Sequence, residues 1–132
     1  MRELTLAVVG IDFPNTDRNR SNRRYELLLC APGDAVSLRP EPKNPHDRHA
    51  VAVWSSRGVQ VGYLTAERAP WIGARLRGGE EVAAVFQGLG DHAAYVRVRF
   101  GGGVPTLPVA REVRTEADAD FYPDPEGSEW GA

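Results

Sequence analysis

The polar side chains best suited to bind a ligand are concentrated in one proline-rich stretch. From position 40 to position 50 the sequence reads PEPKNPHDRHA, and five of its side chains can make directed polar contacts: Lys43, Asn44, His46, Asp47 and Arg48. Its three prolines lack backbone donors and fix φ, so we expect the stretch neither to continue a sheet nor to begin a helix. A loop held this stiffly predicts a surface binding site.

Two other interpretations of this stretch remain open. Asp47 can close an Asx turn beneath the Asn44-Pro45 bend, a structural role that is compatible with binding. His46, Asp47 and His49 also place two imidazoles and a carboxylate within four residues, which could begin the metal site of a hydrolase. These three side chains need not converge in a proline-held loop, so we favour a site without a metal or other cofactor.

Size and composition indicate one soluble domain. The chain has 132 residues, of which 42% are hydrophobic and 26% charged, and it contains no apolar run of the roughly 18 residues that a membrane span needs. The N-terminus lacks the pattern of a signal peptide, so we expect a cytoplasmic protein. Cys30 is the only cysteine, which excludes an internal disulfide, and it ends an apolar run where a buried, unreactive thiol is expected.

Charge is distributed unevenly along the chain. Residues 111–132 hold two basic and seven acidic side chains, a net charge of -5, which leaves +3 on residues 1–110. A mildly basic body is compatible with a polyanionic partner. The acidic part also contains Phe121, Tyr122 and Trp130. Acidic segments with aromatic residues often fold against partners, so an interaction module that recruits a protein partner through this tail is an alternative function. The tail could instead mimic nucleic acid and occupy its own barrel.

Short strands dominate the predicted fold. Residue types favour strands in seven ranges: 4–11, 25–30, 35–38, 50–54, 59–64, 82–87 and 94–100. One helix is predicted, with Thr65 as its N-cap, a regular start near Pro70 and an end at Gly78. Ala69, Ile72 and Leu76 would form its buried stripe. This pattern predicts a mainly β protein: a small OB- or SH3-like barrel with one helix over residues 1–105, followed by an acidic, disordered tail over 106–132.

The loop and its flanking strands carry a family resemblance. The string at 41–53, EPKNPHDRHAVAV, and the string at 61–64, VGYL, resemble the HIRAN domain in content and mutual spacing, and the similarity covers roughly residues 4–100. The resemblance implies an OB-like or SH3-like barrel. Eukaryotic members are fused to SNF2-type helicases and grip the 3′-hydroxyl end of single-stranded DNA, whereas small bacterial members consist of little else. The chain lacks a P-loop, so it resembles the stand-alone bacterial kind.

The resemblance also implies roles for individual residues. Phe13 corresponds to an aromatic residue that stacks on a terminal base, and Asp47 to the carboxylate that accepts a hydrogen bond from the 3′-hydroxyl. His46 stands where the helicase-fused domains have a tyrosine, and Tyr63 stands where they often have a histidine. An aromatic ring is therefore present at both places, but the two residue types are exchanged. Asp12 stands where a phosphate-binding arginine is seen. The nearby arginines could supply that charge instead: Arg18, Arg20, Arg23 and Arg24.

The predicted function is therefore non-catalytic binding of single-stranded DNA or of DNA 3′ ends, in repair, replication or mobile-element processing. Asp47 would bind the terminal hydroxyl, the rings would stack on bases, and Lys43, Arg48 and the arginine cluster would contact phosphates. Without the resemblance, Phe13 and Tyr63 would be read as core aromatic residues. The arginine cluster would then be read as a solvated loop.

Overall fold

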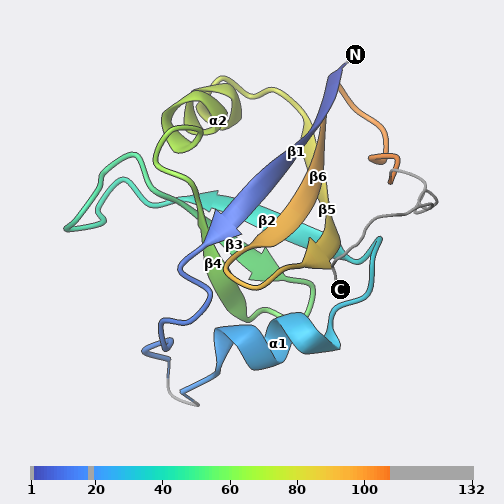
Figure 1. The fold of residues 1–132 in the computed structure, drawn as a ribbon. Helices are drawn as coiled ribbons and strands as arrows, with labels where there is room; N and C mark the ends of the chain where they lie inside the picture. The colour runs from blue at the N-terminus through green and yellow to red at the C-terminus, as the bar shows by residue number, and fades with distance from the viewer. Residues whose placement is uncertain (1, 18–19, 108–132) are drawn as a thin grey trace.

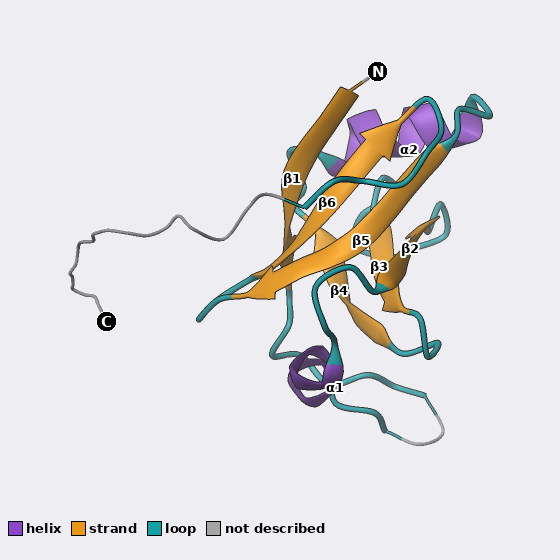
Figure 2. Ribbon diagram, turned by 90° about the vertical axis from the view of Figure 1, so that its right-hand side faces the viewer, coloured by secondary structure: helices purple, strands orange, loops and turns teal. Residues whose placement is uncertain are grey.

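The computed structural model describes residues 2–17 and 20–107. Within them, six antiparallel strands close into a barrel in the order β1-β4-β3-β2-β5-β6, with β1 paired to both β4 and β6 (Figure 1). The strands are β1 Arg2–Val9, β2 Ala35–Pro40, β3 Val51–Ser55, β4 Gln60–Leu64, β5 Val82–Leu89 and β6 Ala94–Phe100. Two helices, α1 Arg23–Leu29 and α2 Ala69–Arg77, lie at opposite ends of the barrel (Figure 2).

The barrel interior is filled by apolar side chains that alternate along the strands. In β6, Ala94, Val96, Val98 and Phe100 are buried, while the residues between them are more exposed. This period of two is the one expected of a strand with one face toward the core. Helix α2 covers one end of the barrel because Ala69 and Ile72 are buried in the same core cluster, as the predicted stripe requires.

Six of the seven predicted strands are present, and the seventh is a helix. Residues 25–30 were expected to be a strand because of their continuous apolar run, but α1 spans most of them. The side chain of Asn22 caps this helix by accepting a hydrogen bond from the Tyr25 N–H (2.8 Å). Leu27 is buried in the core on one side of α1. The expectation of a single helix was therefore wrong. Asn22, a residue type that favours helix N-caps, was the sequence signal for α1, but the continuous apolar run after it favoured a strand.

Two local expectations also need correction. The N-cap of α2 is Arg68 rather than Thr65, whose carbonyl instead accepts hydrogen bonds from the Arg68 and Ala69 N–H groups (3.1 and 2.9 Å). The predicted start of α2 near Pro70 is confirmed, as is its end at Gly78. Pro40 was expected to lie outside any strand, yet it is the last residue of β2 and pairs with Val51. A proline can occupy this place because it ends the strand.

The seam between β1 and β4 depends on a glycine. Strand β1 meets β4 only through Val8 with Leu64 and Val9 with Tyr63. A Cβ at Gly62 would lie 2.5 Å from the Val9 carbonyl oxygen, closer than side-chain carbons come to backbone oxygens. The glycine therefore lets the two backbones approach, and this approach sets Val9 beside Tyr63.

The described chain ends close to the barrel. The Thr106 N–H donates a hydrogen bond to Glu3 Oε1 (2.9 Å). The predicted disordered tail lies almost wholly outside the described residues, as do Phe121, Tyr122 and Trp130. Neither α1 nor α2, the helices of the described part, has the length and apolar character needed to cross a membrane.

Candidate functional site

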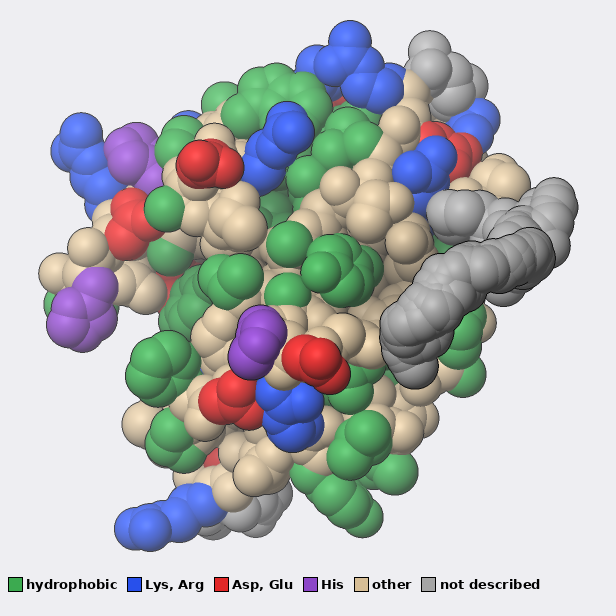
Figure 3. All heavy atoms as spheres, in the orientation of Figure 1, with side chains coloured by type: hydrophobic (Ala, Val, Ile, Leu, Met, Phe, Trp, Pro, Cys, Tyr) green, Lys and Arg blue, Asp and Glu red, His purple; other side chains and the backbone are tan. Residues whose placement is uncertain are grey.

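The proline-rich loop between β2 and β3 is closed by backbone hydrogen bonds at its base and near its tip. The Glu41 N–H donates to the Ala50 carbonyl (2.9 Å), and the Ala50 N–H donates to the Asp47 carbonyl (3.0 Å). The Asn44 N–H donates to the Glu41 carbonyl (3.0 Å). The loop projects from one side of the barrel in Figure 1, and lysine, arginine and histidine side chains gather on it in Figure 3. The predicted stiff surface loop is confirmed.

Side-chain turns fix Asn44 and Asp47 within this loop. Asn44 Oδ1 accepts hydrogen bonds from the His46 and Asp47 N–H groups (2.8 and 3.1 Å). Asp47 Oδ1 accepts from the His49 N–H (2.8 Å), which is the Asx turn expected from the sequence. The second carboxylate oxygen, Oδ2, has no hydrogen-bond partner within residues 2–17 and 20–107. Asp47 is thus oriented through Oδ1 alone.

A surface hollow of about 310 Å³ opens beside Asp47. Its walls are mainly apolar, with a few polar side chains from the loop: Val9, Asn44, His46, Asp47, Ala50, Tyr63, Leu64 and Ala66. Binding sites for small groups have this character, because an apolar wall excludes water while a few polar atoms fix the ligand's orientation. We call this space the loop hollow. It brings four of the predicted site residues together, namely Asn44, His46, Asp47 and Tyr63.

Glu41 connects the loop to the barrel wall, although it was not among the predicted site residues. Its Oε1 accepts hydrogen bonds from the Tyr63 hydroxyl (2.9 Å) and from Asn44 Nδ2 (2.9 Å). The Tyr63 ring is therefore anchored at its tip, and the polar atoms of the Asn44 side chain are used within the loop. The acidic residue that opens the EPKNP string was the available signal for this role.

Arg23 lies beneath the site rather than on its surface. Its side chain is 8% exposed, donates from Nε to Asn15 Oδ1 (2.7 Å) and donates from a terminal nitrogen to the Gly10 carbonyl (2.8 Å). The guanidinium carbon lies 5.6 Å from the centre of the Tyr63 ring. Burial lowers the pKa of Arg23, although a guanidinium stays charged at neutral pH. Arg23 thus supports Tyr63 and the end of β1, a role that the prediction of a phosphate contact did not anticipate.

Arg24 and Asp12 neutralise each other. Arg24 Nε and Nη2 donate to the two carboxylate oxygens of Asp12 (2.7 and 3.1 Å), and Nη2 also donates to the Asp91 carbonyl (2.9 Å). These hydrogen bonds lower the pKa of Asp12 and raise that of Arg24. The acid that occupies the place of a phosphate-binding arginine is therefore offset by a neighbouring arginine.

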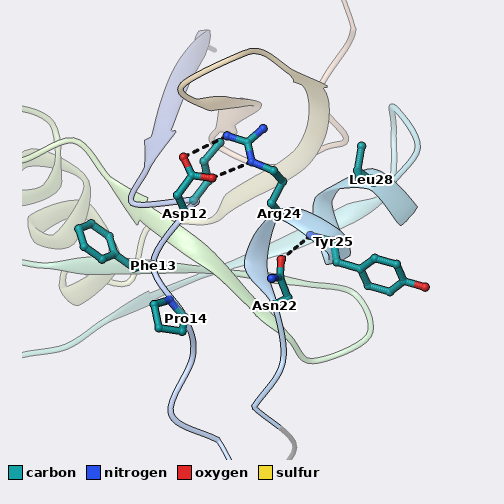
Figure 4. A pocket seen from close by; sticks show the side chains of 8 residues that line it. Asp12, Phe13, Pro14, Asn22, Arg24, Tyr25 and Leu28 are labelled. Carbon is teal, nitrogen blue, oxygen red and sulfur yellow. Dashed lines mark hydrogen bonds and ion pairs between the residues drawn. The ribbon is translucent and has the colours of Figure 1, made fainter.

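Phe13 lies outside the loop hollow but close to it. Its side chain is 69% exposed, and a ring carbon is 3.6 Å from the place of a Cβ at Gly10, the residue after Val9 of the hollow wall. Phe13 also borders a second hollow of about 530 Å³ beside α1. Figure 4 shows its ring directed away from Tyr25, with the Asp12–Arg24 pair between them. The expectation of a core aromatic residue does not hold for Phe13.

The other basic residues predicted to bind phosphate are either exposed on the surface or outside the described residues. Lys43, Arg48 and Arg20 are exposed, the first two on the projecting loop and the third before α1. Arg18 lies outside the described residues. The predicted arginine cluster is therefore divided, since Arg23 and Arg24 have structural partners and Arg20 faces solvent.

The described residues give no support to a metal site. Across 2–17 and 20–107, no three or more histidine, cysteine, aspartate and glutamate side chains come close enough to hold a metal ion, and this includes His46, Asp47 and His49. Cys30 is partly buried, and burial raises the pKa of its thiol. The burial expected from the sequence is therefore only partial, and it favours the protonated thiol over the thiolate, which is the nucleophilic form.

The described part of the chain is thus a small closed β-barrel whose polar loop borders a ring-lined hollow. Two solved structures share this fold. The HIRAN domain of human HLTF has a TM-score of 0.58 and 22% identity, with 74% of each chain covered. A protein from Lactobacillus plantarum has a TM-score of 0.61 and 20% identity, with 76% of this chain and 98% of that chain covered. A comparison with curated proteins gave no match.

The sequence profile of the HIRAN domain matches residues 19–88, more than half of the chain. The chain therefore belongs to the HIRAN domain family. The matched range contains the whole proline-rich loop and every residue that lines the loop hollow except Val9.

Proposed function

We propose that this chain binds single-stranded DNA without catalysis and holds the 3′-hydroxyl end in the loop hollow. HIRAN domains are known as DNA-binding modules, and membership of that family supports a nucleic-acid ligand. DNA repair, replication and mobile-element processing in the cytoplasm are the settings in which such an activity would be used.

The observation that carries the proposal is the orientation of Asp47. Its Oδ1 is occupied by the His49 N–H, while Oδ2 has no partner among the described residues and the side chain borders the hollow. A terminal sugar differs from an internal one because its free 3′-hydroxyl can donate a hydrogen bond. A carboxylate can accept that bond, and charge-assisted bonds of this type contribute about 1.5–3 kcal/mol. Internal nucleotides cannot offer this donor.

Aromatic rings near Asp47 supply the second element of the site. His46 and Tyr63 border the same hollow. Because Arg23 lies over the Tyr63 ring, only the opposite ring face could receive a base. Phe13, exposed just beyond Gly10, extends the aromatic surface toward the next nucleotide. Base stacking contributes about 1–3 kcal/mol for each base and requires no particular sequence.

Exposed cations supply the third element. Lys43 and Arg48 lie on the projecting loop, and Arg20 lies in the segment before α1. These side chains, with Arg18 from outside the described residues, are the proposed phosphate contacts. Arg23 and Arg24 act differently in this proposal, because their guanidinium groups already hold the site and offset Asp12. Affinity should fall as salt rises, since phosphate neutralisation releases counterions.

Fluorescence anisotropy with short oligonucleotides tests the proposal. Three DNA strands of one sequence would end in a 3′-hydroxyl, a 3′-phosphate or a 3′-deoxy sugar, and an RNA strand of that sequence would compare the two nucleic acids. We expect the 3′-hydroxyl DNA to bind most tightly, and the 3′-phosphate to bind most weakly because it faces the Asp47 carboxylate. Equal affinity for all three DNA ends would contradict end recognition. Absence of binding at low salt would contradict the nucleic-acid function itself.

A further inference from the structure

Helix α1 presents an apolar face to solvent. Tyr25, Leu28 and Leu29 are 63%, 67% and 50% exposed. They follow the i, i+3, i+4 spacing that places side chains on one helix face. The opposite face is buried through Arg23, Glu26 and Leu27. Figure 3 shows hydrophobic side chains gathered at the end of the molecule where Figure 1 places α1. A cluster of three large exposed apolar side chains on a short helix indicates an interaction surface.

This face continues into the second hollow, of about 530 Å³, which we call the helix hollow. Its apolar wall comes from the segment after β1 and from α1, through Ile11, Phe13, Pro14, Tyr25 and Leu28. The Asp12–Arg24 ion pair also lines it, as Figure 4 shows. The volume falls within the roughly 300–1,000 Å³ of clefts that enclose small ligands, so one or two large side chains can enter it.

The end of the described chain lies beside the turn that follows α1. Leu107 Cδ1 is 3.9 Å from the position of a Cβ at Gly33, and Gly33 follows the last residue of α1 by four positions. Phe121 and Tyr122 follow Leu107 by about 14 residues. At about 3.4 Å for each extended residue, they can reach nearly 50 Å from that point. Helix α1, with seven residues, is only about 10 Å long, so its whole exposed face is within reach.

We propose that α1 and the helix hollow are the docking surface for the chain's own segment 116–130, with Phe121 and Tyr122 placed against Tyr25 and Leu28. The segment supplies large rings where the surface lacks apolar partners, and the chain leading to it leaves the barrel beside the turn that follows α1. The inference does not depend on nucleic-acid binding. It replaces the idea that the tail enters the loop hollow with a specific surface formed by α1 and the helix hollow.

Amide chemical shifts of the full-length protein test the proposal through paired substitutions. The double variant Phe121→Ser, Tyr122→Ser should move the amide signals of Tyr25, Leu28 and Leu29 and leave those of residues 44–47 in place. The reciprocal variant Leu28→Ser, at an exposed position that should not affect folding, should move the signals of residues 121 and 122. Val113→Ser, in the tail but outside the proposed segment, is the matched control and should move neither set.

Three results would overturn the proposal. Unchanged α1 signals in the double variant would mean that the tail does not contact the helix. Shifts at residues 44–47 instead would place the tail in the loop hollow. Shifts at α1 that grow with protein concentration would show that a second copy of the chain covers this face. A thermal melt of each variant checks that the barrel remains folded.

Discussion

The two hollows of this barrel are built in different ways. The loop hollow is bordered by a segment whose backbone and side chains are tied by hydrogen bonds, and Asp47 Oδ2 has no hydrogen-bond partner within residues 2–17 and 20–107. The helix hollow is larger and has a similarly apolar wall, but the charged side chains that line it, Asp12 and Arg24, are bonded to each other. Directed polar atoms favour a ligand with a defined donor, whereas an apolar face favours rings and aliphatic groups of many shapes. We therefore propose a nucleotide end as the ligand of the loop hollow and a peptide segment as the ligand of the helix hollow.

The two regions share one buried support. Arg23 belongs to α1, but its guanidinium bonds to the turn after β1 and lies over Tyr63 of the loop hollow. Phe13 follows the same turn and borders the helix hollow. Substitutions can therefore be chosen to affect both regions, only one, or neither.

Gly62→Ala should have the largest effect and should disrupt the wall of the loop hollow. The added Cβ would meet the Val9 carbonyl oxygen at 2.5 Å and Val8 Cγ1 at 2.8 Å, so β1 and β4 must separate. We expect a loss of about 2–5 kcal/mol in the free energy of unfolding, measured by denaturant titration. Gly88→Ala is the matched control, because no atom lies within 4 Å of its Cβ position. Equal stability of the two variants would contradict the close approach.

Arg23→Met should affect both regions, and it should lower the free energy of unfolding by less than Gly62→Ala does. The substitution keeps much of the buried volume but leaves the Asn15 side chain and the Gly10 carbonyl without their donor. An unsatisfied buried polar group costs about 1–3 kcal/mol, which urea unfolding would measure. Arg20→Met, at an exposed position, should leave stability unchanged. Arg23→Lys should not restore the loss, because a lysine cannot bond to both acceptors with the geometry of a guanidinium.

Tyr63→Phe should affect the loop hollow alone. The variant loses the hydrogen bond from the Tyr63 hydroxyl to Glu41 Oε1 and keeps the ring. We expect a loss of about 0.5–1.5 kcal/mol and faster amide exchange in residues 41–50, with no change in α1. Tyr25→Phe on the exposed face of α1 is the control. Faster exchange in α1 than in the loop would show that Glu41 does not brace the site.

Asp12→Asn should have the smallest effect, and it tests the ion pair that lines the helix hollow. The hydrogen bonds from Arg24 lower the pKa of Asp12 below its usual 3.8, so the native state favours the ionised carboxylate. The pair therefore stabilises the protein above that usual pKa, and the contribution disappears as the pH falls through the lowered value. Thermal melts from pH 7 to pH 2 should show a small loss for the variant that vanishes in acid. A constant difference across this range would contradict the pairing.

The barrel and the loop could be predicted from sequence because their signals are local. Alternating residues mark the strands, and three prolines with Asn44 and Asp47 define the loop. Helix α1 could not be predicted by the same means. Its run YELLLC has apolar residues on both sides of the helix, and only the tertiary fold shows that Leu27 is buried while Leu28 is exposed. The support by Arg23 was missed for a similar reason, since its contacts with Gly10 and Tyr63 depend on packing between distant residues.

The most direct test of the nucleic-acid site is a double-mutant cycle between the protein and the DNA end. Affinities of the wild type and Asp47→Asn would be compared for strands with a 3′-hydroxyl and a 3′-deoxy sugar. Asparagine keeps an acceptor for the His49 N–H, so the loop should hold its shape. Asp34→Asn is the matched control, because Asp34 also accepts a backbone N–H in a turn, from Ala31 (2.9 Å). We predict that the wild type and Asp34→Asn prefer the 3′-hydroxyl about 10-fold or more, and that Asp47→Asn loses most of this preference. The same preference in all three proteins would contradict recognition of the terminal hydroxyl by Asp47.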